Sequence, residues 1–72
     1  MATKEQVKTA LLAIQVLAQA VKLAGQIPAG TLYAAVMSYM NVDTFDSFVA
    51  RLVGAGLVRR DASHLLVWIG PA

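Results

Sequence analysis

The side chains best suited to binding an anion lie close together in the last third of this 72-residue chain. Arg59 and Arg60 are adjacent, and they follow Gly54 and Gly56. Glycine-rich loops that hold a phosphate with backbone N–H groups combine glycines and basic residues in a similar way. A dinucleotide-binding loop, however, needs the spacing G-x-G-x-x-G after a strand, and Arg59 occupies the position of its third glycine. The spacing argues against a dinucleotide site and leaves the arginines as candidates for contact with a phosphate backbone.

The other reactive side chains are too few to suggest a catalytic or metal site. The chain has no cysteine, one histidine and four carboxylates, which excludes disulfides and thiolate zinc sites and argues against a metal held by one chain. No serine lies in a recognisable nucleophile motif, and His64 has only Asp61 nearby to orient it. We therefore predict that the protein is not an enzyme and that it binds no cofactor and no metal.

The composition favours a small folded domain that associates with itself. Hydrophobic residues make up 58% of the chain and charged residues 14%, the opposite of the balance found in disordered proteins. A single core in a chain this short rarely supplies more than about 3–5 kcal/mol, and disulfides and metals are unavailable to reinforce it. The formal net charge of +2 is low for a non-specific nucleic-acid binder. Self-association is therefore the expected source of additional stability.

The first element expected to support these residues is a long helix. Residues 4–24 contain no glycine or proline and are rich in alanine and leucine, which predicts a helix over about 4–24. Thr3 is its expected N-cap, and Gly25 lies just past its end. Its expected core face consists of Val7, Leu11, Ile14, Ala18 and Val21. The opposite face is also apolar, so we predict a homodimer interface there, formed by Leu12, Val16 and Leu23.

The same segment resembles an export signal only superficially. Lys4 and Lys8 precede the apolar run, and "AQA" at 18–20 imitates a cleavage site. Glu5 interrupts the basic region, and two glutamines and a lysine interrupt the apolar run. We judge the run too short and too polar to span a bilayer, and we expect a cytoplasmic protein without a membrane partner.

After a turn-rich connector, "GQIPAG" at 25–30, a second helix is predicted over about 31–40. Within the connector, Ile27 is expected to be a one-residue strand or a core anchor. The apolar stripe of the helix consists of Leu32, Ala35, Val36, Tyr39 and Met40. Tyr33 and Met37 fall off this stripe, and they either form an exposed interaction patch or pack against the first helix.

A third helix is predicted over about 43–55, with Asp43 as its N-cap and Asp46 at the third helical position. Its core face is expected to consist of Phe45, Phe48, Val49, Leu52 and Val53. Gly54 and Gly56 are expected to end it, one of them in a left-handed conformation. Two strands joined by "DAS" then form a hairpin over about 57–69. The predicted fold is one domain, 1–72, mainly α with a C-terminal β-hairpin.

The order of elements points to a known architecture. Two helices joined by a short corner form a helix-turn-helix, and a hairpin follows the second of them. The stretch "IPAGTLYAAVMSYMNVDTFDSFVARLVGAGLVRRDASHLLVWIG" resembles the winged helix-turn-helix superfamily. Within it, "FDSFVARLVGAGLVRRD" is similar to the recognition helix and first wing strand of bacterial MarR-type regulators. The resemblance implies a three-helix winged helix-turn-helix, and a small transcription regulator that binds double-stranded DNA as a homodimer.

The resemblance also implies which residues would contact DNA. On the outward face of the third helix, these are Thr44, Ser47 and Arg51. On the wing, they are Arg59, Arg60, Ser63 and His64. Arginine can bind guanine with two hydrogen bonds, and hydroxyls can serve bases or phosphates. Family members usually carry more basic residues, and here the nearby aspartates would repel phosphate, namely Asp43, Asp46 and Asp61.

A second interpretation remains open, because winged helices also serve as protein-protein interaction modules without DNA binding. The segment from residue 27 onward has three arginines and three aspartates, and so no net formal charge. In this interpretation Arg59 and Arg60 are solvated charges that protect a strand edge. Arg51 would pair with Asp46 or Glu5 at the surface.

Overall fold

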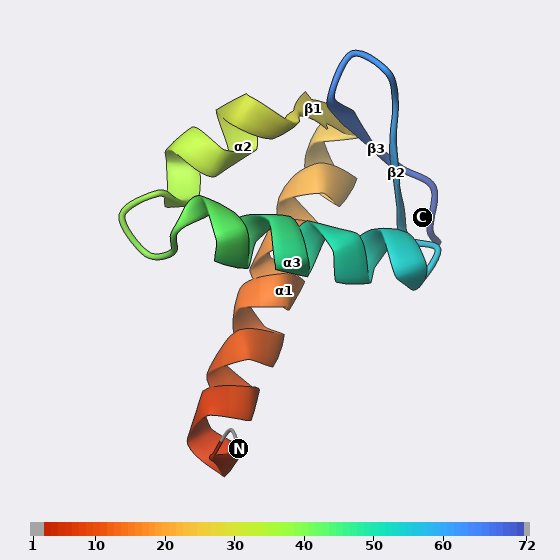
Figure 1. Ribbon diagram of the computed structural model, residues 1–72. Helices are drawn as coiled ribbons and strands as arrows, with labels where there is room; N and C mark the ends of the chain where they lie inside the picture. Colours follow the sequence, from red (N-terminus) through yellow and green to blue (C-terminus); the bar gives the residue numbers. More distant parts are fainter. Residues whose placement is uncertain (1–2, 72) are drawn as a thin grey trace.

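The computed structural model describes residues 3–71 and contains three helices and a small three-stranded antiparallel sheet (Figure 1). The prediction of a mainly helical chain with three helices and C-terminal strands is confirmed at this level. In chain order the elements are α1 (Lys4–Ala24), β1 (Gln26–Pro28), α2 (Ala29–Val36), α3 (Val42–Gly54), β2 (Val58–Arg60) and β3 (Leu65–Trp68).

The bounds of α1 match the prediction because both ends carry strong local signals. The Thr3 hydroxyl accepts a hydrogen bond from the Gln6 backbone, and the Gln6 side chain accepts one from the Thr3 backbone. This reciprocal capping box satisfies two N–H groups that the first turn leaves free. Gly25 ends the helix with a φ of +78°, a conformation that side-chain-bearing residues rarely adopt.

The predicted bounds of α2 and α3 need correction. α2 covers Ala29–Val36 rather than 31–40, since the chain turns after Val36. Asn41, not Asp43, caps α3: its side-chain oxygen accepts a hydrogen bond from the Thr44 backbone at 2.8 Å. Asparagine and aspartate are nearly equal as N-caps, so the local sequence alone did not separate the two positions. As predicted, a glycine after α3, Gly56, has a positive φ of +76°.

The sheet has one strand more than the predicted hairpin. Its order is β1-β3-β2, with β3 in the middle. β1 pairs with β3 through Ile27 opposite Leu66, and β2 pairs with β3 through Arg59 opposite Val67. Ile27, expected as a one-residue strand or anchor, is therefore the middle of a three-residue strand. Covering both edges of β3 satisfies its backbone groups and fixes the position of the C-terminal segment.

The core lies where α1, α2 and α3 meet the inner face of the sheet. Its fully buried members are Leu17, Val21, Leu32, Phe45, Val49, Leu52, Val58 and Leu66. Tyr33 packs against this core rather than forming an exposed patch, with its ring centre 5.2 Å from that of Phe45. Aromatic pairs in such tilted arrangements stabilise a core beyond the area they bury. Met37, in contrast, is exposed.

Several residues expected in the core lie at the surface. Val7 and Leu11 are 46% and 55% exposed, because the N-terminal half of α1 projects away from the other elements (Figure 1). Leu17, which was absent from the predicted core face, is buried instead. Tyr39 is 85% exposed, since α2 ends before reaching it. Val53 is also exposed, at the end of α3.

The length and composition of α1 change the expectation about membranes. The helix is 21 residues long, and by length and composition alone it is apolar enough to cross a membrane. The statement that this run is too short and too polar was therefore wrong. Core helices of soluble proteins and signal sequences pass the same test, so the finding does not decide where the protein resides.

Candidate nucleic-acid interface

The outward face of α3 carries two of its three predicted contact residues. Phe45, Val49 and Leu52 point into the core, which leaves Ser47 and Arg51 exposed. Thr44 does not share this position: it is half-buried and lines a groove toward α1. It lies about 60° around the helix from Ser47, given 100° per residue, on the flank that faces α1. Thr44 is therefore not an outward residue, contrary to the prediction.

An ion pair joins the second strand to α3. The Arg60 guanidinium lies 3.8 Å from the Asp46 carboxylate, and both side chains are about half exposed. The contact shows that β2 runs beside α3, so two predicted groups of basic residues lie near each other. It also partly neutralises Arg60. Arg51, expected to pair with Asp46 or Glu5, forms an ion pair with neither in the described part of the chain. Asp46 and Arg51 lie five positions apart on α3, which places them about 140° apart around the helix.

The two adjacent arginines point to opposite faces of the sheet. Successive side chains of a strand alternate in direction, so Arg60 shares the inner face with buried Val58, whereas Arg59 lies on the outer face opposite Val67. Arg59 has no ion-pair partner among residues 3–71. The two adjacent arginines therefore differ: Arg60 is partly neutralised by Asp46, and Arg59 is not.

The turn between β2 and β3 is organised by Asp61. One carboxylate oxygen of Asp61 accepts hydrogen bonds from the Ser63 and Leu65 backbones, each at 2.9 Å. Asp61 was predicted only as a repulsive neighbour of DNA, and the structure gives it a structural role. Ser63 and His64 are exposed in this turn, as expected of contact residues, and His64 has a positive φ of 61°. Histidine tolerates this conformation better than most residues, but still at a cost.

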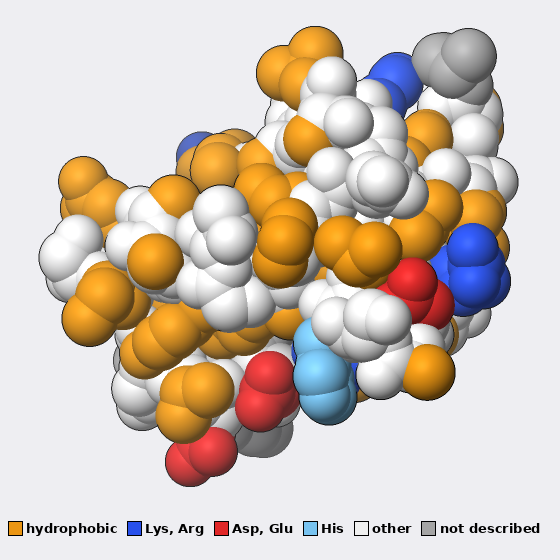
Figure 2. All heavy atoms as spheres, turned by 90° about the horizontal axis from the view of Figure 1, so that it is seen from above, with side chains coloured by type: hydrophobic (Ala, Val, Ile, Leu, Met, Phe, Trp, Pro, Cys, Tyr) orange, Lys and Arg blue, Asp and Glu red, His pale blue; other side chains and the backbone are white. Residues whose placement is uncertain are grey.

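Charge is sparse around these elements. On the face in Figure 2, hydrophobic and uncharged side chains cover most of the surface, and the few basic side chains lie apart from one another. Within the described part of the chain, no three histidine or carboxylate side chains gather as metal ligands would. The surface is therefore not one continuous basic patch, and any attraction for phosphate must come from a few individual arginines.

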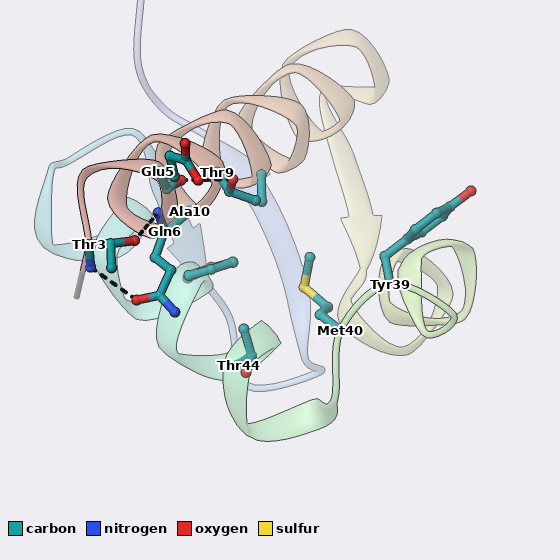
Figure 3. Close-up of a pocket in the computed structure, with 10 residues that line it drawn as sticks. Thr3, Glu5, Gln6, Thr9, Ala10, Tyr39, Met40 and Thr44 are labelled. Atoms are coloured by element: carbon teal, nitrogen blue, oxygen red, sulfur yellow. Dashed lines mark hydrogen bonds between the residues drawn. The ribbon is translucent and has the colours of Figure 1, made fainter. Parts of the chain in front are cut away.

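A groove that sequence reasoning missed lies between α1 and the corner joining α2 to α3. It encloses about 740 Å³ and is open to solvent. Met40 and Thr44 point into it, whereas the ring of Tyr39 points outward (Figure 3). Ala10, Ala13 and Phe48 also line it. Its walls come from residues more than 25 positions apart in the chain, which explains why no local pattern revealed it.

The residues predicted to form the dimer interface are all exposed. Leu12, Val16 and Leu23 are 53%, 62% and 83% accessible. They lie on one face of α1, away from the buried Leu17 and Val21. The face is largely exposed, although Val16 also lines a small cavity together with Val36, Tyr39 and Met40.

Comparison with known proteins gives no further guide to the site. No family model matches the chain, and no curated protein or solved structure is similar to it at a significant level.

Proposed function

We propose that this chain is a winged helix-turn-helix protein that binds double-stranded DNA as a homodimer and regulates transcription in the cytoplasm. The observation that supports this most directly is the packing of the β2–β3 pair beside α3, where Val58 and Leu66 share the core with the buried residues of α3. Exposed Ser47 and Arg51 on α3 and the exposed turn containing Ser63 and His64 would then form one interface.

The shape of α3 suits entry into a major groove. Its outer face carries small residues, Ser47, Ala50 and Gly54, all of which are exposed. Small side chains allow the helix backbone to approach base edges closely, and the groove is wide enough for a helix. Arg51 would donate to a base or phosphate, and Arg59 would contact phosphates from the wing.

The charge distribution implies weak binding by one copy. Asp46 partly neutralises Arg60, and Asp43 lies in the first turn of α3, where a phosphate would otherwise be attracted. Two or three phosphate contacts supply little affinity at physiological salt. Two copies double the number of contacts and impose a fixed spacing between half-sites. DNA binding is therefore tied to dimerisation through α1.

The test is a fluorescence-anisotropy titration of random duplex DNA over a salt series. Arg51→Ala and Arg59→Ala are each expected to weaken binding and to lower the salt-dependence slope by about one. Asp46→Asn is expected to strengthen binding several-fold, because it releases Arg60 from its ion pair. Lys4→Ala is the control, since it removes the same charge from the projecting end of α1.

A second candidate function is a protein-protein interaction module. The groove beside Met40 favours it, because it is open to solvent and its lining includes Tyr39, which is largely exposed. Absence of salt-sensitive binding at about 50 mM salt and high micromolar protein would contradict the DNA proposal, since non-specific affinities are ~10⁻⁴–10⁻⁶ M even at physiological salt. Unchanged DNA affinity in a Tyr39→Ala variant would show that the groove beside Met40 is not part of the DNA-binding surface.

A further inference from the structure

A continuous exposed stripe runs along the full length of α1. Its members follow one another at alternating spacings of four and three residues, and all six are exposed: Glu5, Thr9, Leu12, Val16, Gln19 and Leu23. Alternating four-three spacing is the seam of a two-stranded coiled coil. The edges of the stripe differ: one carries Lys8, Gln15 and Lys22, and the other carries Gln6, Ala13 and Ala20.

We propose that two copies of this chain pair through the stripe as an antiparallel helix pair. This inference rests on the homodimer of the proposed function and specifies its geometry. In the antiparallel register Leu12 of each copy packs against Val16 of the other. Thr9 then faces Gln19 of the other copy, and Glu5 lies at the end of the seam beside the second copy's Leu23 and Lys22.

The area available matches what a stable dimer needs. A 21-residue helix is ~31 Å long, and half of its lateral accessible surface is on the order of 600 Å². A standard interface buries about 800 Å² on each partner, so pairing along α1 supplies most of it. In its own chain the same helix fully buries only Leu17 and Val21, with Ile14, Ala18 and Ala20 partly buried. A second copy is therefore the occupant whose dimensions fit the stripe.

Two observations favour the antiparallel orientation. A parallel pair would place the two Glu5 carboxylates directly opposite each other, which is destabilising, whereas the antiparallel pair separates them by about 27 Å, or 18 residues of helix rise. Antiparallel pairing also places Glu5 of one copy next to Lys22 of the other. This attraction offsets the repulsion between Lys22 of one copy and Lys8 of the other. In addition, the other elements pack around the C-terminal half of α1 (Figure 1), so antiparallel pairing places one compact body at each end.

The composition of the stripe argues against a lipid surface as the occupant. Half of its members are polar, namely Glu5, Thr9 and Gln19, and they lie in both halves of the helix. A face that lies in a membrane interface is apolar along its length. In a coiled coil the polar layers are expected instead, because they set orientation and register at some cost in stability.

Disulfide cross-linking tests the orientation, because the chain has no cysteine of its own. Thr9→Cys and Gln19→Cys proteins are mixed under reducing conditions without DNA, and then mildly oxidised. The mixture is expected to give a covalent species of twice the 7.6 kDa chain mass, and each protein alone is expected to give much less. An Ala50→Cys protein is the control. Residue 50 is exposed on α3, so this protein measures how much cross-linking random collisions produce.

Each outcome decides the proposal. Stronger cross-linking within either single variant than in the mixture overturns the antiparallel orientation. A monomeric wild-type chain in analytical ultracentrifugation at high concentration overturns pairing altogether, as does monomeric protein that partitions onto phosphatidylcholine vesicles. A monomer that still binds DNA would overturn this inference and the homodimer of the proposed function but leave DNA binding standing, and a cross-linked dimer that binds no DNA would overturn only the proposed function.

Charge reversal provides an independent check. Glu5→Lys is expected to weaken the antiparallel dimer roughly three- to tenfold, because it faces the second copy's Lys22 in both halves of the interface. Adding Lys22→Glu is expected to restore the affinity. In a parallel pair Glu5→Lys replaces one like-charge contact with another, so unchanged affinity contradicts the proposal. Circular dichroism confirms that each variant keeps its helix content.

Discussion

The two longest helices use their apolar residues in different ways. α3 buries Phe45, Val49 and Leu52 within 13 residues, whereas α1 buries only Leu17 and Val21 within 21. α3 lies between α1 and β2, and both of these neighbours cover it. α1 meets the other elements mainly through its C-terminal half (Figure 1). An apolar sequence therefore makes a helix face available for burial, and the neighbouring elements decide whether the burial takes place within the chain.

The largest expected effect separates the buried and exposed faces of α1 itself. Leu17→Ala is expected to lower the free energy of unfolding by about 2–5 kcal/mol, which approaches the whole stability of so small a domain. Leu12→Ala removes the same atoms from an exposed position, and is expected to change monomer stability by less than about 0.5 kcal/mol. Urea denaturation at several protein concentrations measures both. Equal losses in the free energy of unfolding for the two variants at low protein concentration would mean that the two faces of α1 do not differ in burial.

The ends of the two helices are expected to be more alike than their faces. Gly25 after α1 and Gly56 after α3 both have positive φ, and no atom lies within 4 Å of an added Cβ at either position. Alanine at Gly56 is therefore expected to cost about 1–2 kcal/mol through backbone strain alone, and alanine at Gly25 at least as much. Thermal denaturation of the two variants measures the cost. A negligible loss at either position would contradict the strained backbone geometry.

The N-caps are expected to differ because their helices begin in different surroundings. Asn41→Ala removes the bond to the Thr44 backbone one turn from buried Phe45, and is expected to cost about 1 kcal/mol. Thr3→Ala opens a capping box far from the first buried residue of α1, so local fraying limits its cost to ~0.3 kcal/mol. Chemical denaturation compares the pair, and a larger loss for Thr3→Ala would show that the projecting half of α1 is coupled to the core.

The smallest expected effect is a gain in the turn between β2 and β3. His64→Gly relieves a positive φ and is expected to stabilise the fold by up to about 0.5 kcal/mol, since glycine's flexible unfolded state offsets part of the gain. Asp61 is unchanged in this variant, so the two hydrogen bonds that it accepts in the turn are kept. Differential scanning calorimetry records the shift, and a lower melting temperature would indicate that the His64 side chain stabilises the turn.

Local signals carried much of the prediction. The bounds of α1, its Thr3 cap and the glycines after α1 and α3 follow from side-chain chemistry within a few residues. The buried positions Phe45, Val49 and Leu52 of α3 follow from helical periodicity. These features were correct because each depends on neighbours in the sequence.

The errors share the opposite property. Choosing Leu17 over Val7 for the core requires knowing how far along α1 the other elements reach. The end of α2, the burial of Thr44 and the groove beside Met40 depend on where the corner between α2 and α3 is placed. The pairing of Arg60 with Asp46 depends on the path of β2. None of these distances is encoded in a local pattern.

The glycines and arginines near the C-terminus show the same division. By itself the sequence determined that Gly54 and Gly56 end a helix and that a basic strand follows, because backbone conformation and strand propensity are local properties. Only the tertiary structure decided that Arg59 and Arg60 point to opposite faces and that Asp46 forms an ion pair with Arg60. The physical reason is that charge interactions depend on distance in space, and packing of β2 between α3 and β3 sets that distance.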